Sequence, residues 1–408
     1  MMVFRMGMER TKWIVAATAA CFGALLAASP AGAAIAQEDV NYDLGSPPAP
    51  SPADENFLDV YRPDGSLATD TRPVVVYVHG GAWRAGDKAN QINRKVNLFT
   101  DAGYVFVSVN YRLSTNPIDT SFPSDRVRFP DHPDDVGEAI GWIDRNIAAY
   151  GGDPTRLLLI GHSAGAHISA LVSTDPSYLD AYEVEPWQVI GTVALDGDAY
   201  DVADRIAEVP SPQDDYLLSA FGTAAENAAE GSWAAGSPLL WAGPRDPEHL
   251  IVTQAALPGR AEDADALALA LGQDPAASVI RAPCNHEGIN DGVGEPGDPC
   301  GETAAIVAFF ARMVDGSDEP VAKIKQHPGK RVKPRRGKSK AKVKFTFASS
   351  LEGTKFECRL DGKQFRSCRS PYKDKLRRGR YTFKVRPQAP SGRPGEAESF
   401  SFRVARAR

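Results

Sequence analysis

The 408-residue sequence has only five cysteines, and no two of them are spaced as C-x-x-C. The seven histidines are scattered along the chain and form no group with those cysteines. Structural zinc sites draw four such ligands from short, regular spacings, so this pattern argues against a zinc-binding protein. We expect no metal and no cofactor.

Long hydrophobic runs are also lacking, apart from one near the N-terminus. Three basic residues precede an uncharged stretch from Trp13 to Ala28, and small residues follow it. This order is typical of a signal peptide over 1–36, cut near Ala34 or Ala36, and predicts a secreted protein with no membrane span after cleavage. A retained anchor would need a longer run, and a lipoprotein cut before Cys21 is the third alternative.

Four cysteines follow the signal segment, and an even number in an exported chain predicts disulfides. The two close pairs, Cys284 with Cys300 and Cys358 with Cys368, each fall within one segment and are the natural connectivity.

Basic residues are scarce everywhere except at the C-terminal end. Residues 321–408 hold 27 Lys and Arg against 6 Asp and Glu, whereas the other 320 residues hold 19 basic and 46 acidic ones. Two modules of opposite charge therefore share the chain. The basic one is suited to an anionic surface, such as an acidic cell-surface polymer, a polysaccharide or lipid headgroups, or to the acidic module itself. We expect no nucleic acid as a partner, because the protein is predicted to lie outside the cell.

Short β-branched runs alternate with helical patterns from residue 56 onward, after a flexible lead-in over 37–55. Several of these runs, such as 74–79 and 157–162, are almost solidly apolar, as strands buried on both faces of a sheet are. We predict an α/β domain over 56–318 with a doubly wound, mostly parallel sheet. The irregular stretch 203–247 is either an insertion that covers the site or a surface excursion.

The C-terminal end reads differently. A Lys/Arg/Pro-rich linker is predicted over 319–344, and alternating strand-like segments follow over 345–408, with Cys358 and Cys368 between them. This pattern predicts a small all-β sandwich.

The stretch Gly161-His162-Ser163-Ala164-Gly165 is a G-x-S-x-G motif between an apolar strand and a helical run. Such a turn exposes the serine at the start of the helix, which predicts Ser163 as a nucleophile. The sequence His79-Gly80-Gly81-Ala82-Trp83 follows an earlier strand. Its Gly81 and Ala82 amides, together with that of Ala164, are candidate oxyanion donors for acyl transfer.

With both motifs in this order, the stretch from residue 56 to 314 resembles the α/β-hydrolase fold. More narrowly, it is similar to carboxylesterases of the feruloyl-esterase-like and kynurenine-formamidase-like branch. The segment 345–408 resembles bacterial Ig-like domains. The first resemblance implies Ser163 as the nucleophile and the HGG turn as the oxyanion hole.

The general base is expected on a loop after the last strand, where His286 lies. Cys284, two residues earlier, would restrain this loop through its disulfide.

The acid departs from the family pattern, because the residue before Pro258, where the resemblance implies Asp, is Leu257. We predict that Asp196, which ends the preceding strand, replaces it. Glu262 and Asp263 are the alternatives just past the vacant position, and Glu287, adjacent to His286, is a weaker one.

These residues predict an exported serine esterase that cleaves small or polymer-linked carboxylic esters through an acyl-enzyme. Two other readings stay open. One is a formamide or amide hydrolase with the same machinery, and the other is a surface-binding protein whose hydrolase domain is inactive.

Overall fold

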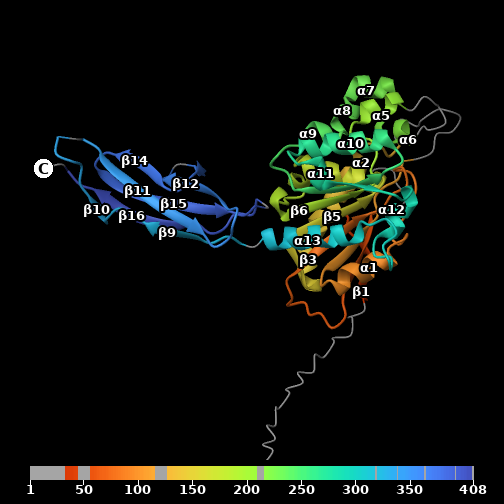
Figure 1. The fold of residues 1–408 in the computed structure, drawn as a ribbon, viewed down its shortest axis with the longest axis horizontal. Coiled ribbons are helices and arrows are strands. Elements are labelled where there is room, and N and C mark those ends of the chain that lie inside the picture. The colour runs from red at the N-terminus through yellow and green to blue at the C-terminus, as the bar shows by residue number, and fades with distance from the viewer. Residues whose placement is uncertain are drawn as a thin grey trace, which may run out of the picture.

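The structure, a computed structural model, describes residues 33–44, 56–114, 126–208, 216–317, 319–337, 339–362, 364–390 and 392–406 (Figure 1). Most of the predicted signal peptide and lead-in lies outside these residues. The predicted cleavage points at Ala34 and Ala36 fall within the first strand, β1 (Ala33–Asn41). We refer below to residues 33–317 as the N-terminal region and to residues 319–406 as the C-terminal region.

One eight-stranded sheet forms the centre of the N-terminal region, in the order β1-β2-β4-β3-β5-β6-β7-β8. The first two pairings, β1 with β2 and β2 with β4, are antiparallel, and the others are parallel. The other strands are β2 (Phe57–Pro63), β3 (Arg72–Val78), β4 (Val105–Val109), β5 (Gly152–His162), β6 (Val189–Leu195), β7 (His249–Gln254) and β8 (Val279–Ala282).

The apolar strands bury both faces of this sheet. Val74, Val76 and Val78 of β3 pack toward α2 (Asp131–Asn146) and α3 (Ala164–Thr174). Val75 and Tyr77 pack on the other face, toward α1 (Asn93–Asp101) and α13 (Thr303–Gly316) (Figure 1). The prediction that the almost solidly apolar runs form strands buried on both faces of the sheet is confirmed for β3.

The other α-helices described in the region are α4 (Ser177–Asp180), α5 (Val202–Glu208), α6 (Tyr216–Phe221), α7 (Ala224–Glu230), α8 (Ser232–Ala235), α9 (Pro238–Trp241), α10 (Pro258–Ala270), α11 (Pro275–Ser278) and α12 (His286–Gly292). The irregular stretch 203–247 forms helices α5 to α9, except for residues 209–215, which lie outside the described residues. Phe221 of α6 packs edge-on against Trp83, with ring centroids 5.0 Å apart. This stretch therefore packs against the HGGAW turn.

The C-terminal region contains two β-sheets around one core. Their orders are β10-β16-β15-β12-β13 and β14-β11-β9. The strands are β9 (Ala322–Gln326), β10 (Arg331–Val332), β11 (Ala341–Ser349), β12 (Lys355–Leu360), β13 (Arg366–Cys368), β14 (Tyr372–Leu376), β15 (Gly379–Gln388) and β16 (Glu398–Val404).

The segment predicted as a linker, 319–344, differs from that expectation. It contributes β9, β10 and the start of β11 to the two sheets. Ala322 is buried and Ile324 packs against the core, while Lys323 and Lys325 are exposed. This alternation with period two is a strand signal that the density of lysine and proline obscured.

Candidate active site

Ser163 stands on a tight turn between β5 and α3, with φ 54° and ψ −119°. The turn needs both flanking glycines. A Cβ on Gly161 would lie 2.1 Å from the Gly165 carbonyl oxygen, and one on Gly165 would lie 2.1 Å from the Val78 carbonyl oxygen. Because no larger residue fits at either position, the motif forces the serine into this strained, projecting geometry.

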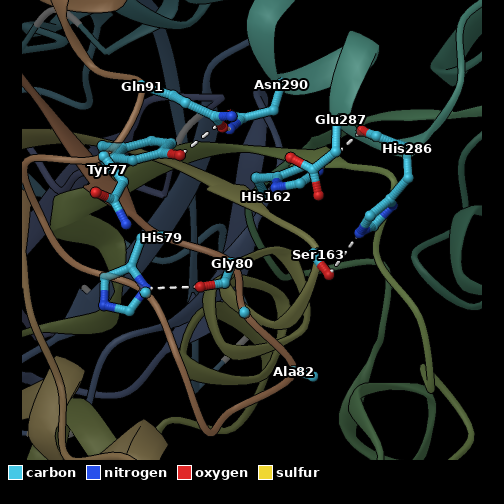
Figure 2. A pocket seen from close by; sticks show the side chains of 13 residues that line it. Tyr77, His79, Gly80, Ala82, Gln91, His162, Ser163, His286, Glu287 and Asn290 are labelled. Atoms are coloured by element: carbon cyan, nitrogen blue, oxygen red, sulfur yellow. Dashed lines mark hydrogen bonds between the residues drawn. The ribbon is translucent and has the colours of Figure 1, made fainter.

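Three side chains from distant parts of the sequence form one hydrogen-bonded chain. The His286 Nε2 lies 2.9 Å from the Ser163 Oγ (Figure 2). The His286 Nδ1 lies 2.6 Å from the Asp196 Oδ2. His286 is the first residue of α12, after β8, and Asp196 directly follows β6. In parallel neighbouring strands these ends share one edge of the sheet, which brings the three residues together.

Asp196 is fully buried, and four groups approach its carboxylate. Besides His286, they are the backbone N–H of Gln254 (3.1 Å), the Gln254 side-chain amide (2.6 Å) and the Arg260 guanidinium (3.0 Å). Burial opposes the charged form, but the hydrogen bond from His286 and the charge of Arg260 outweigh it and lower the pKa of Asp196 below its ordinary value. The carboxylate is therefore held ionised beside the imidazole.

Sequence reasoning missed Gln254 and Arg260. Gln254 ends β7, next to β6, so its place at the same sheet edge was a usable signal. Arg260 lies on the first turn of α10 and also contacts Asp198 through its second terminal nitrogen (3.4 Å). Its other terminal nitrogen lies 3.3 Å from the His286 Nδ1. Since Nδ1–H donates to Asp196, this is a close approach of two donors rather than a hydrogen bond.

The alternative acids lie elsewhere. Glu262 is exposed on α10, and Asp263 accepts a hydrogen bond from the Tyr200 backbone N–H at 3.1 Å. Burial raises the pKa of Asp263 to about 7, so it is a poor anionic partner. Leu257 precedes α10 and is 42% exposed. Glu287 lines the cavity beside His286 (Figure 2).

The HGGA turn lies against the serine. A Cβ on Gly80 would come within 3.0 Å of the Ser163 Cβ, and one on Gly81 (φ 123°) would lie 1.9 Å from the Ala85 carbonyl oxygen. No acceptor within the described ranges takes the N–H of Gly81 or Ala82. Ala164 begins α3, so its amide is one of the free donors at a helix start. The three predicted donors thus flank the nucleophile.

Two buried histidines support this arrangement. Burial lowers the pKa of His162 to about 3 and that of His79 to about 4, so both are neutral. His162 directs Nε2 to the His286 carbonyl oxygen at 3.1 Å, which fixes the start of α12. His79 stacks on Tyr111, with ring centroids 4.5 Å apart, and its Nδ1 lies 2.7 Å from the Gly80 carbonyl oxygen.

A cavity of about 520 Å³ opens beside Ser163 and His286. Its far wall is polar: Tyr77 donates to Asn290 at 3.1 Å, and Asn290 in turn bonds Gln91 (Figure 2). Behind that wall, buried Lys95 donates to the Asn290 carbonyl oxygen at 2.7 Å, and burial lowers its pKa to about 8. A cavity of this size accommodates a small organic substrate.

A disulfide restrains the loop that carries His286. Cys284 and Cys300 are bonded with their Cα atoms 5.4 Å apart, and Cys358 and Cys368 form the second disulfide. Within the described ranges, no group of three or more His, Cys, Asp or Glu could hold a metal ion. No helix in the same ranges is long and apolar enough to cross a membrane.

Solved structures of esterases resemble this chain. A structural match covers 68% of this chain and 95% of a truncated carbohydrate esterase from gut microbiota, with TM-score 0.50 and 19% identity. Another covers 71% of this chain and 88% of esterase B from Lactobacillus rhamnosis, with TM-score 0.52 and 15% identity. The N-terminal region has the α/β-hydrolase fold.

Similarity in sequence covers a shorter part of the chain than similarity in structure. The family model described as BD-FAE matches residues 58–191, which include Ser163 and the HGGA turn but neither Asp196 nor His286. The probable carboxylic ester hydrolase LipM of Mycobacterium tuberculosis is 36% identical over 150 residues, covering 36% of this chain and 32% of LipM. Esterase LipQ of the same organism is 39% identical over 134 residues, covering 32% and 29%. The chain thus matches about a third of the length of these curated relatives.

Proposed function

We propose that this protein is a serine hydrolase that cleaves carboxylic esters through an acyl-enzyme on Ser163. The observation that carries the proposal is the chain Ser163–His286–Asp196, with heavy-atom distances of 2.9 and 2.6 Å. The names of the similar proteins, which are ester hydrolases and esterases, support the same reaction class.

In the first half-reaction the Ser163 Oγ attacks the ester carbonyl carbon while His286 Nε2 takes the hydroxyl proton. The negative charge develops on the former carbonyl oxygen, where the amides of Gly81, Ala82 and Ala164 donate to it. The C–O bond to the alcohol breaks, and the leaving alkoxide receives the proton from His286.

Water completes the cycle. His286 Nε2 takes a proton from the water as it attacks the acyl carbon, and then returns that proton to Ser163 as the acid leaves. Throughout, Asp196 accepts the proton on Nδ1 as a hydrogen bond and stabilises the imidazolium. Gln254 and Arg260 hold the carboxylate in place.

Ester hydrolysis is measured with p-nitrophenyl acetate and butyrate on residues 37–408, beside the Ser163→Ala variant. We expect release of p-nitrophenol by the parent and a loss on the order of 10⁶-fold in kcat for the variant, as when a triad nucleophile is removed. Equal rates for the two proteins would contradict the proposal. Absence of activity on any short ester would favour the inactive, surface-binding reading.

The protein is further proposed to be exported, with the C-terminal region held on an anionic polymer at the cell surface. Two disulfides support an oxidising compartment. Cleavage near Ala36 would remove the residues of β1 that pair with Tyr61 to Pro63, while the part from Gln37 to Asn41 would still pair with β2. N-terminal sequencing of secreted protein tests this: an intact Met1 would contradict it.

A further inference from the structure

The three-stranded sheet of the C-terminal region has the order β14-β11-β9 (Figure 1). Its solvent face carries lysines on two adjacent strands. On β11, Lys342 and Lys344 are exposed and alternate with buried residues. On β14, Lys373 and Lys375 are exposed in the same way. The register pairs Lys342 with Lys375 and Lys344 with Lys373. Because directly paired residues point to the same side of a sheet, these four residues form one surface, called here the lysine face.

Like charges that lie directly opposite each other destabilise a sheet, and these pairs have Cβ atoms about 5 Å apart. None of the four lysines has an ion pair within the described part of the chain. Lysines on an edge strand such as β14 are a known protection against edge-to-edge pairing. Protection of an edge does not explain Lys342 and Lys344, because β11 is the central strand of this sheet.

The other sheet of the region is also basic, but its charge is partly compensated. Arg386 forms an ion pair with Glu357 at 2.6 Å. The acidic Asp361 lines the same hollow as Arg380. Among the residues that the structure describes, the lysine face has no such ion pair, so of the two sheets it has the more unmatched positive charge.

The geometry of the lysine face defines the kind of partner. The charges repeat about 5 Å apart across the strands and about 7 Å apart along them, on an extended surface. Outward positions of β11 and β14 hold no aromatic or large apolar side chain. Binding to single-stranded nucleic acid uses stacking aromatics, and helices that lie on membranes insert apolar side chains, so the face lacks the contacts that either partner needs.

We propose that the lysine face binds an anionic polysaccharide, a linear chain with repeated carboxylate groups. This step rests on the proposed ester hydrolysis in one respect: the substrate must carry carboxylic esters, which polysaccharides bear as substituents and nucleic acids do not. The C-terminal region then keeps the active site close to ester groups of the polymer to which it is bound.

Binding is tested with polygalacturonate from which all ester groups have been removed, so that the result does not depend on hydrolysis. Isothermal titration of residues 37–408 is carried out at several salt concentrations. The test variant combines K342Q, K344Q, K373Q and K375Q. The matched control removes four exposed cations from the other sheet's side, with K330Q, R331Q, R380Q and R403Q.

We expect the lysine-face variant to lose affinity on the order of 100-fold at low salt, and its dependence of log K on log salt to become shallower by about 3. The control variant should lose affinity by less than about 10-fold under the same conditions. Both variants should melt at or above the parent's temperature, since facing like charges are removed, and both should hydrolyse p-nitrophenyl acetate as the parent does.

Several results would overturn the proposal. Equal losses of affinity in the two variants would indicate that net charge alone drives binding. Absence of binding by the parent would also contradict the proposal. So would tighter binding of the parent to phosphatidylglycerol vesicles or duplex DNA than to polygalacturonate at equal charge. The binding probe, polygalacturonate, carries no ester, so a failure to bind it does not depend on hydrolysis. A failure of the proposed hydrolysis is detected separately, in the p-nitrophenyl ester assay.

Discussion

Strands of the central sheet in the N-terminal region are buried on both faces by helices, whereas each sheet in the C-terminal region buries one face and exposes the other. A sheet covered on both faces can present functional groups only at its edge, where Ser163, Asp196 and His286 follow β5, β6 and β8. A sheet with an open face can present them along its strands, as Lys342 and Lys344 are presented. The predicted chemistry of each region follows from this difference.

The largest expected effect removes the acid at the edge of the central sheet. Asp196→Asn should lower kcat for p-nitrophenyl esters on the order of 10⁴-fold, because the amide no longer holds His286 in the productive tautomer. Polygalacturonate binding should not change. Unchanged ester hydrolysis would contradict the assignment of Asp196 and direct attention to a Ser–His dyad.

The complementary change is made in the other region. Phe383 is fully buried and stacks on Phe345 with ring centroids 4.0 Å apart. Phe383→Ala should destabilise the C-terminal region by about 3–5 kcal/mol, measured by urea unfolding. Hydrolysis of a small ester should continue. If activity were lost together with the C-terminal fold, the two regions would not be independent in the way the comparison requires.

The N-terminal region also contains a buried ionisable side chain, Glu302, that lacks a partner within the described ranges. Glu302 in the N-terminal region is fully buried with both carboxylate oxygens lacking a hydrogen-bond partner among the described residues, and burial raises its pKa to about 7. A carboxyl with a raised pKa in the folded state binds its proton more tightly there. Stability should therefore fall as pH rises from about 4.5 to 7.

Glu302→Gln should remove this loss and stabilise the protein at pH 8 by on the order of 1–2 kcal/mol, with little change at pH 4.5. Thermal melts at both pH values provide the measurement. An equal change at the two values would show that Glu302 acts through packing rather than through its proton.

Arg260 is expected to have a smaller effect on kcat. Its guanidinium lies 3.0 Å from the Asp196 carboxylate and helps to hold it, so Arg260→Gln should lower kcat for p-nitrophenyl esters by roughly tenfold. Arg205→Gln is the control, because Arg205 pairs with Asp198 but not with Asp196. Equal kcat values for the two variants would mean that Arg260 does not position Asp196.

The smallest effect is expected at Leu257, where the family resemblance of the sequence implies an acid. Leu257 is the N-cap of α10 and makes no side-chain cap. Leu257→Asp should stabilise the protein by about 0.5–1 kcal/mol through capping and leave kcat unchanged. The same substitution should not rescue Asp196→Asn. Rescue would show that β7 can still supply the acid.

Much of the N-terminal fold could be predicted from the sequence, because solid apolar strands and the glycine spacing around Ser163 are local signals. The place of Asp196 could also be predicted, since ends of neighbouring parallel strands share an edge. The contacts of Gln254 and Arg260 with that carboxylate could not, because they depend on side-chain directions at the start of α10. In the C-terminal region, β9 and β10 were not predicted, because the high Lys, Arg and Pro content of 319–344 indicated a linker and the alternation of buried and exposed residues there is short.

The most direct test of the central claim is covalent labelling of Ser163. Residues 37–408 are treated with diethyl p-nitrophenyl phosphate, and the modified peptide is located by mass spectrometry. We predict one diethylphosphoryl group per chain, on Ser163, at a rate that falls by several orders of magnitude in His286→Ala. Labelling at another residue, or equal rates in the parent and His286→Ala, would contradict a nucleophile activated by this histidine.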